Sequence, residues 1–184
     1  MKFFFSLLAG VALGFAALPA CIHAQTDATL PAVGQKAPTF TLGSQDGTQI
    51  ALKSFHGQWV VLYFYPKDMT TGCTIEAHNF QRDLPQFEAR KAVVLGVSVD
   101  SADSHQQFCT KEGLTFRLLA DTTHEVTKAY GSLGDHNGTA YALRNTFLID
   151  PKGEIVKVWT KVNPATASTD VLAALPAPHG PALN

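Results

Sequence analysis

The sequence predicts one α/β domain, a three-layer sandwich around a mixed central sheet with an added N-terminal β-hairpin. Three observations support this fold. Several short runs are almost wholly apolar and β-prone, as strands buried on both faces are. Amphipathic helical patterns lie between these runs. A second hairpin and a terminal helix follow the alternating strands and helices, and this order implies three packed layers.

The strands are expected where apolar runs border turn signals. The cluster 43–47 predicts a first hairpin, and Asp150-Pro151-Lys152-Gly153 predicts a second. The expected strands are 40–42, 49–52, 59–65, 92–99, 116–120, 144–149 and 154–160.

The helices are expected where apolar residues recur every three or four positions. One stripe runs along the first helix, and Pro85 is expected to end or kink that helix near Leu84. The stripe consists of Cys73, Ala77, Phe80, Leu84 and Phe87. Further helices are expected over 101–112, 123–130 and 165–175, the first two ended by glycine and the last by proline. A thioredoxin-like fold has this order of elements.

Composition excludes several classes of protein. The chain has 184 residues, 46% of them hydrophobic and 16% charged, which suits one globular domain. A formal net charge of −1 gives no electrostatic reason to expect a nucleic acid or an anionic membrane as partner. The seven histidines show no metal-ligand spacing with the cysteines, so no metal is expected.

The first residues are typical of an export signal. Lys2 precedes an uncharged apolar run over 3–18, which is short for a membrane span. We expect a signal peptide over 1–24, a flexible mature N-terminus over 25–36, the domain over 37–176 and a loose tail over 177–184. The protein is thus expected to be periplasmic or otherwise exported. Lipidation at Cys21, within a lipobox-like segment containing Pro19, and an uncleaved anchor remain alternatives.

Cys73 stands where a helix begins after a buried strand. A helix N-terminus carries partial positive charge and unpaired N–H groups, which stabilise a thiolate, the nucleophilic form of cysteine. Thr70 can place a hydroxyl beside the sulfur, and Pro66 can shield it from water. Arg144 is the candidate cation, with Glu76 expected to orient it through a bidentate pair.

Pro66-x-x-x-Thr70-x-x-Cys73 resembles the active-site signature of the peroxiredoxins. The surrounding stretch 63–77, the strand end 97–100 and the segment 144–150 are similar to the bacterioferritin comigratory protein, or peroxiredoxin Q, subfamily. The resemblance covers roughly residues 34–175. It implies that Cys73 is the peroxidatic cysteine, completed by Pro66, Thr70 and Arg144. It also implies reduction of hydrogen peroxide and organic hydroperoxides without metal, haem or flavin, and it favours a monomer.

The chain departs from many members of that subfamily, which carry a resolving cysteine five residues after the peroxidatic one. His78 occupies that position here. Other members carry the resolving cysteine in the helix after the next strand, where Cys109 lies, 36 positions after Cys73. The resemblance therefore implies a Cys73–Cys109 disulfide, formed from a sulfenic acid and reduced by a thioredoxin-like dithiol protein. Joining the two sulfurs is expected to require movement of their helices.

Plainer interpretations remain open beside this one. Cys109 can be a core residue or half of a permanent disulfide, Glu76 can serve only the helix dipole, and Thr70 and Pro66 can be ordinary loop and cap residues. An exported thiol–disulfide oxidoreductase of the same fold would need a second cysteine at position 76, where this chain has Glu76. A copper-delivery protein would need a second cysteine at position 77, where this chain has Ala77. A non-enzymatic domain stapled by Cys73 and Cys109 is a further alternative.

Overall fold

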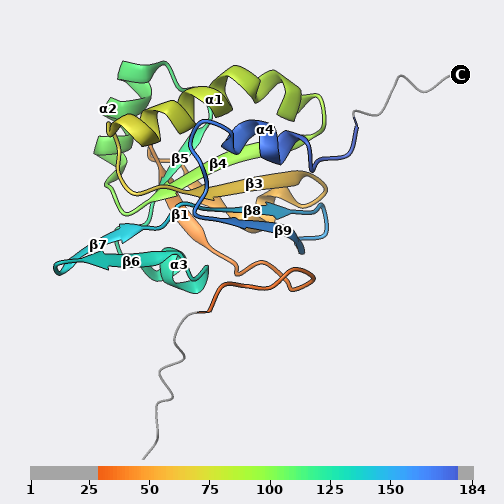
Figure 1. Cartoon of the computed structure of the whole chain (residues 1–184), viewed down its shortest axis with the longest axis horizontal. Helices are drawn as coiled ribbons and strands as arrows, with labels where there is room; N and C mark the ends of the chain where they lie inside the picture. Colours follow the sequence, from red (N-terminus) through yellow and green to blue (C-terminus); the bar gives the residue numbers. More distant parts are fainter. Residues whose placement is uncertain (1–28, 178–184) are drawn as a thin grey trace, which may run out of the picture.

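A seven-stranded mixed sheet forms the centre of the molecule in the computed structural model, which describes residues 29–177 (Figure 1). The strand order is β2–β1–β5–β4–β3–β8–β9. β3 pairs in parallel with β4, β4 pairs in parallel with β5, and the other pairs are antiparallel. The strands are β1 (Thr41–Ser44), β2 (Gln49–Ala51), β3 (Trp59–Phe64), β4 (Ala92–Ser98), β5 (Arg117–Ala120), β8 (Asn145–Ile149) and β9 (Ile155–Thr160). The predicted mixed sheet and its N-terminal hairpin are confirmed.

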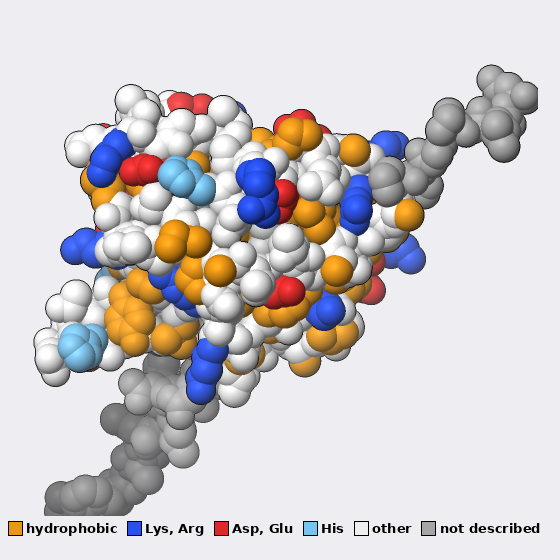
Figure 2. Space-filling model, turned by 45° about the horizontal axis from the view of Figure 1, so that its top comes forward, with side chains coloured by type: hydrophobic (Ala, Val, Ile, Leu, Met, Phe, Trp, Pro, Cys, Tyr) orange, Lys and Arg blue, Asp and Glu red, His pale blue; other side chains and the backbone are white. Residues whose placement is uncertain are grey.

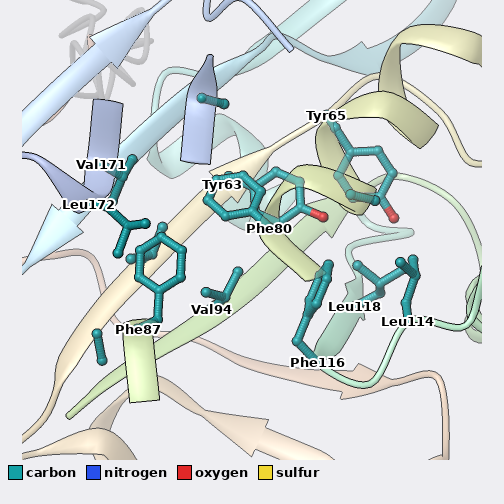
Figure 3. Close-up of a cluster of buried hydrophobic side chains, with 14 of the residues drawn as sticks. Tyr63, Tyr65, Phe80, Phe87, Val94, Leu114, Phe116, Leu118, Val171 and Leu172 are labelled. Carbon is teal, nitrogen blue, oxygen red and sulfur yellow. The ribbon is translucent and has the colours of Figure 1, made fainter. Parts of the chain in front are cut away.

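Helices cover both faces of the sheet and complete the three layers. Helices α1 (Thr71–Glu88), α2 (Ala102–Glu112) and α4 (Ala167–Leu172) lie on one face, and the short α3 (Glu125–Ala129) lies on the other (Figure 1). Each face buries its own apolar cluster. Under α1, the rings of Tyr63 and Phe80 stack with their centroids 4.6 Å apart (Figure 3).

The central strand β3 places the start of α1 at one edge of the sheet. Its side chains alternate between the two buried clusters, with Val61 and Tyr63 on the α1 side and Leu62 and Phe64 on the other. After β3, the loop 65–70 leads directly into α1. The first turn of α1 is therefore fixed by a strand that is buried on both faces.

Pro85 was expected to end or kink the first helix near Leu84, and an end at that position is wrong. Helix α1 continues to Glu88 with Pro85 inside it. Pro85 lies in the last turn, where its fixed φ suits a helix and its carbonyl still accepts from the Ala89 N–H. Continuing the helix also buries Phe87 completely, and this burial offsets the one hydrogen bond that the proline cannot donate.

Two other helices are shorter than expected, and one hairpin was not expected at all. His124 has φ of 64°, so α3 begins only at Glu125, and α4 spans six residues. The hairpin pairs β6 (Leu133–His136) with β7 (Thr139–Ala142). Its turn is Asn137-Gly138, both with positive φ, a pair that strongly favours a tight hairpin turn.

The N-terminal segment lies against the hairpin formed by β8 and β9. The Gly34 N–H donates to the Ile155 carbonyl, and the Ala37 N–H donates to the Gly153 carbonyl. The described part of the segment expected to be flexible is therefore hydrogen-bonded to the domain. The expected signal peptide, Cys21 and all but the first residue of the expected tail lie outside the described residues.

The described residues carry mixed charge on their surface. On the face shown in Figure 2, basic and acidic side chains are interspersed, and no large patch of one sign is visible. Among residues 29–177, no helix combines the length and the hydrophobicity that crossing a membrane requires.

Candidate active site

Cys73 is the third residue of α1, after the N-terminal cap Thr70. The first hydrogen bond of the helix runs from the Thr74 N–H to the Thr70 carbonyl, so the N–H groups of the preceding residues point out of the helix end. The Cys73 side chain is a free thiol and is 1% exposed, but Gly72 and Thr74 are half-buried. The sulfur therefore lies just beneath the surface, at the positive end of the helix dipole.

Arg144 directs its guanidinium at this sulfur from the residue before β8. Its Nη2 donates to Cys73 Sγ at 3.1 Å, and its Nη1 donates to Glu76 Oε2 at 2.5 Å. The two contacts fix the plane of the guanidinium, so its positive charge is held beside the sulfur. The structure thus brings together Cys73, Arg144 and Glu76, as the sequence predicted.

Glu76 is completely buried one turn after Cys73. Burial raises the pKa of Glu76 to about 7, although the neighbouring Arg144 guanidinium acts in the opposite direction. The predicted bidentate pair is wrong, because only Oε2 receives a hydrogen bond and Oε1 has no partner in the described part of the chain. The other terminal guanidinium nitrogen, Nη2, donates to the Cys73 sulfur instead.

Thr70 and Pro66 border this arrangement. Thr70 is exposed, and its hydroxyl donates to the Lys67 carbonyl at 3.0 Å rather than bonding to the sulfur. Its proton is therefore occupied, and its oxygen lone pairs remain available to accept a hydrogen bond. Pro66 is half-buried in the same loop.

Gly72, which from the sequence alone is most simply a turn residue, borders the Arg144 guanidinium at the site. Its φ is not positive, and it lies inside α1. A Cβ atom at this position would lie 2.8 Å from Arg144 Nη2. The absence of a side chain is what lets the guanidinium approach the sulfur, and no local sequence signal reports a contact 72 positions away.

Gly72→Ala is expected to slow peroxide reduction without weakening the fold. The added methyl displaces Arg144 from the sulfur, and loss of one such charge-stabilising donor lowers a rate by about 10²-fold. Alanine is the better helix former by about 1 kcal/mol, so the unfolding midpoint should not fall. Stopped-flow measurement of Cys73 oxidation, with thermal unfolding as the control, tests this. A parental oxidation rate would show that the position has no part in placing Arg144.

Cys109 lies in the last turn of α2, is buried, and is free rather than bonded to Cys73. Burial raises the pKa of Cys109 to about 11, and the Asp68 carboxylate adds to the effect. His78 is exposed, and its Nε2 lies 3.0 Å from Glu112 Oε2 at the end of the same helix. Both cysteines are therefore buried free thiols in this structure.

A polar cluster that the sequence analysis missed lies beneath the loop before Cys73. The Asp68 carboxylate receives hydrogen bonds from Tyr65 and Ser104, and His105 Nδ1 lies 2.8 Å from it. Burial alone would raise the pKa of Asp68. The hydrogen bonds with His105, Ser104 and Tyr65 outweigh burial and hold that pKa below its usual value. No spacing rule joins residues 36 and 37 positions apart, so only the fold reveals them.

The site shows no constellation for a metal ion. Within residues 29–177, no three His, Cys, Asp or Glu side chains converge in a way that would hold one. The chemistry that the arrangement can perform is that of a sulfur nucleophile beside a fixed cation.

Comparison with known proteins assigns this arrangement to a family. The model of the AhpC/TSA family matches residues 33–158. Peroxiredoxin Bcp of Xanthomonas campestris is 41% identical over 158 residues, which cover 83% of this chain and 97% of that protein. Peroxiredoxin Bcp of Bacillus subtilis is 42% identical over 134 residues, covering 71% of this chain and 85% of that protein.

Solved structures agree with these relatives. The Xanthomonas campestris bacterioferritin comigratory protein, studied for alkyl peroxide reduction, has a TM-score of 0.70 at 40% identity, covering 73% of this chain and 88% of that one. A mutant of Xylella fastidiosa PrxQ has a TM-score of 0.75 at 36% identity, covering 79% and 96% respectively. These matches confirm the predicted thioredoxin-like fold.

Proposed function

The chain belongs to the AhpC/TSA family as a peroxiredoxin of the Bcp type, a thiol-dependent peroxidase, and from this premise we propose how its residues divide the reaction. Cys73 reduces hydrogen peroxide and organic hydroperoxides, Cys109 resolves the oxidised sulfur, and an external dithiol protein restores both thiols. The observation that carries the proposal is the Arg144 guanidinium shared between Cys73 and Glu76.

In the first step, the Cys73 thiolate attacks one oxygen of the hydroperoxide. An S–O bond forms as the O–O bond breaks, and the departing oxygen leaves as an alcohol or water after taking a proton. Cys73 becomes a sulfenic acid, so the sulfur is oxidised and the peroxide reduced by two electrons. The Arg144 charge, 3.1 Å from the sulfur, stabilises the thiolate and the negative charge that develops on the leaving oxygen.

Thr70 is proposed to hold the peroxide in line with the sulfur. Because the Thr70 hydroxyl donates its hydrogen bond to the Lys67 backbone carbonyl, its oxygen acts as an acceptor for the O–H of the substrate. Pro66, half-buried in the same loop, limits the motion of that loop and the access of water. Peroxide is thereby oriented by an acceptor and a cation.

In the second step, the Cys109 thiolate attacks Cys73 Sγ. An S–S bond forms as the S–O bond breaks, and the sulfenic oxygen leaves as hydroxide, which takes a proton from solvent to become water. A thioredoxin-like dithiol then reduces the disulfide through a mixed disulfide. Solved structures of Xanthomonas campestris peroxiredoxin Q include two variants in which a different cysteine is replaced by serine, and those cysteines are 36 positions apart, as Cys73 and Cys109 are here.

The mature protein is proposed to act outside the cytoplasm as a monomer, on the grounds of the sequence pattern of residues 1–24 and the subfamily resemblance.

Intact mass after one equivalent of hydroperoxide tests the proposed route. The reduced protein is expected to lose two hydrogens, and peptide mapping should join Cys73 to Cys109. The mass of the untreated native protein also identifies its mature N-terminus and any lipid. A stable gain of one oxygen, without a disulfide, would exclude Cys109 as the resolving cysteine.

A further inference from the structure

The buried polar cluster beneath the Cys73 loop has no part in the reaction described above. It consists of Tyr65, Asp68, Ser104 and His105, and we call it the Asp68 cluster. Tyr65 donates to Asp68 Oδ1 at 2.7 Å, and Ser104 donates to Asp68 Oδ2 at 2.7 Å. His105 Nδ1 lies 2.8 Å from the same Oδ2 and 3.3 Å from the Tyr65 oxygen. Asp68 is 6% exposed and His105 is fully buried.

The cluster connects the two chain segments that carry the cysteines. Asp68 precedes Cys73 by five residues, in the loop that leads into α1. Ser104 and His105 precede Cys109 on α2, and His105 is one helical turn away from it. The same loop is also bound to the end of β4, because the Asp68 N–H donates to Asp100 Oδ2 at 2.9 Å.

Joining the two sulfurs is expected to require separation of the two segments from their present positions. Cys73 is held by Arg144 in the first turn of α1, and Cys109 is buried in the core under α2. Buried as it is, Cys109 is a thiol and not the thiolate that attacks. A disulfide also needs close, correctly oriented Cβ atoms, and both cysteines are free thiols in this structure.

The Asp68 cluster resists that separation. A buried carboxylate is tolerated because its donors surround it. Tyr65 lies on the same loop as Asp68, whereas Ser104 and His105 lie on α2, so these two contacts join the loop to α2. Each hydrogen bond to a charged group is worth about 10- to 100-fold in an equilibrium constant. The opposing feature is His105 Nε2, which is buried without a hydrogen-bond partner in the described part of the chain and gains water when the cluster opens.

We propose that the Asp68 cluster is a latch that holds the dithiol enzyme in its peroxide-reactive conformation and must open before Cys73 and Cys109 join. Asp68, Ser104 and His105 are then positioning residues that set the equilibrium between the dithiol and the disulfide forms. The proposal rests on the proposed Cys73–Cys109 disulfide. Its consequence is that weakening the latch favours the disulfide.

The test measures the fraction of disulfide in mixtures of reduced and oxidised dithiothreitol, using Asp68→Asn and Ser104→Ala. Ser104 is only half-buried, so its variant keeps the test decisive even if Asp68→Asn fails to fold. Ser104→Ala is expected to shift the dithiothreitol ratio at which half of the protein is oxidised about tenfold toward the disulfide, and Asp68→Asn by at least as much.

Thr127→Val is the matched control. It removes a hydroxyl that donates at 2.6 Å to another buried carboxylate, Asp121, which has no side-chain hydrogen bond to the members of the Asp68 cluster among the described residues. This variant should lower the unfolding midpoint and leave the dithiol–disulfide ratio at the parental value.

Parental ratios in both latch variants, or shifts no larger than that of Thr127→Val, would overturn the latch and leave the disulfide intact. Absence of an intramolecular disulfide in the parent at every ratio would instead overturn the proposed function together with the latch. The two failures are therefore distinguishable.

Discussion

Cys73→Ser is expected to abolish peroxide consumption, with a fall in rate of at least about 10³-fold. A serine hydroxyl remains protonated beside Arg144, so the site keeps its cation and loses its nucleophile. The substitution is nearly isosteric, so α1 should remain folded. Peroxide loss measured with a dithiol reductant, alongside circular dichroism, checks the expectation.

The matched comparison for Cys73→Ser is the corresponding change at the other cysteine. If Cys73→Ser consumed peroxide as fast as the parent, the nucleophile would have to be sought elsewhere, and the site built around Arg144 would have no catalytic role.

Cys109→Ser is expected to separate the two half-reactions. Oxidation of Cys73 should keep its parental rate, because the Arg144 hydrogen bonds to Cys73 and Glu76 do not involve Cys109. Steady-state turnover with a protein dithiol should fall by at least roughly tenfold, because the sulfenic acid has no intramolecular partner.

Mass spectrometry gives this second prediction a direct readout. The variant should gain one oxygen after one equivalent of peroxide, then two or three oxygens with excess, as the sulfenic acid oxidises further. Unchanged turnover would show that Cys109 is a core residue and that the reductant attacks Cys73 directly.

Much of the fold could be predicted because the strands carry strong, local signals. The apolar runs of β3 and β4 match a sheet covered on both faces, and Gly113 marks the end of α2. The hairpin β6–β7 was missed because its strands are only partly buried and lack an apolar run, although its Asn137-Gly138 turn was a usable signal.

The residues of the site also fall into those that local sequence signals reveal and those that only the fold reveals. Cys73, Glu76 and Thr70 share one short segment, and Arg144 stands at a recognisable strand start, so a motif could collect them. The roles of Gly72 and Asp68 depend on close approach to residues from β8 and α2, which only the folded chain specifies. Pro85 shows the opposite case, a strong local signal overruled by the burial of Phe87.

The guanidinium at the site is anchored one turn deeper in the helix than the nucleophile that it serves. Glu76 lies in the part of α1 whose side chains fill the core, while Cys73 lies in the first turn, which has the fewest helical hydrogen bonds. If that turn frays during the proposed resolution step, the Glu76 contact is expected to keep Arg144 in place, with one nitrogen left free at the position of the sulfur. We expect this fixed cation to act as a template on which the reduced segment rewinds, so that each catalytic cycle restarts from a site already half assembled.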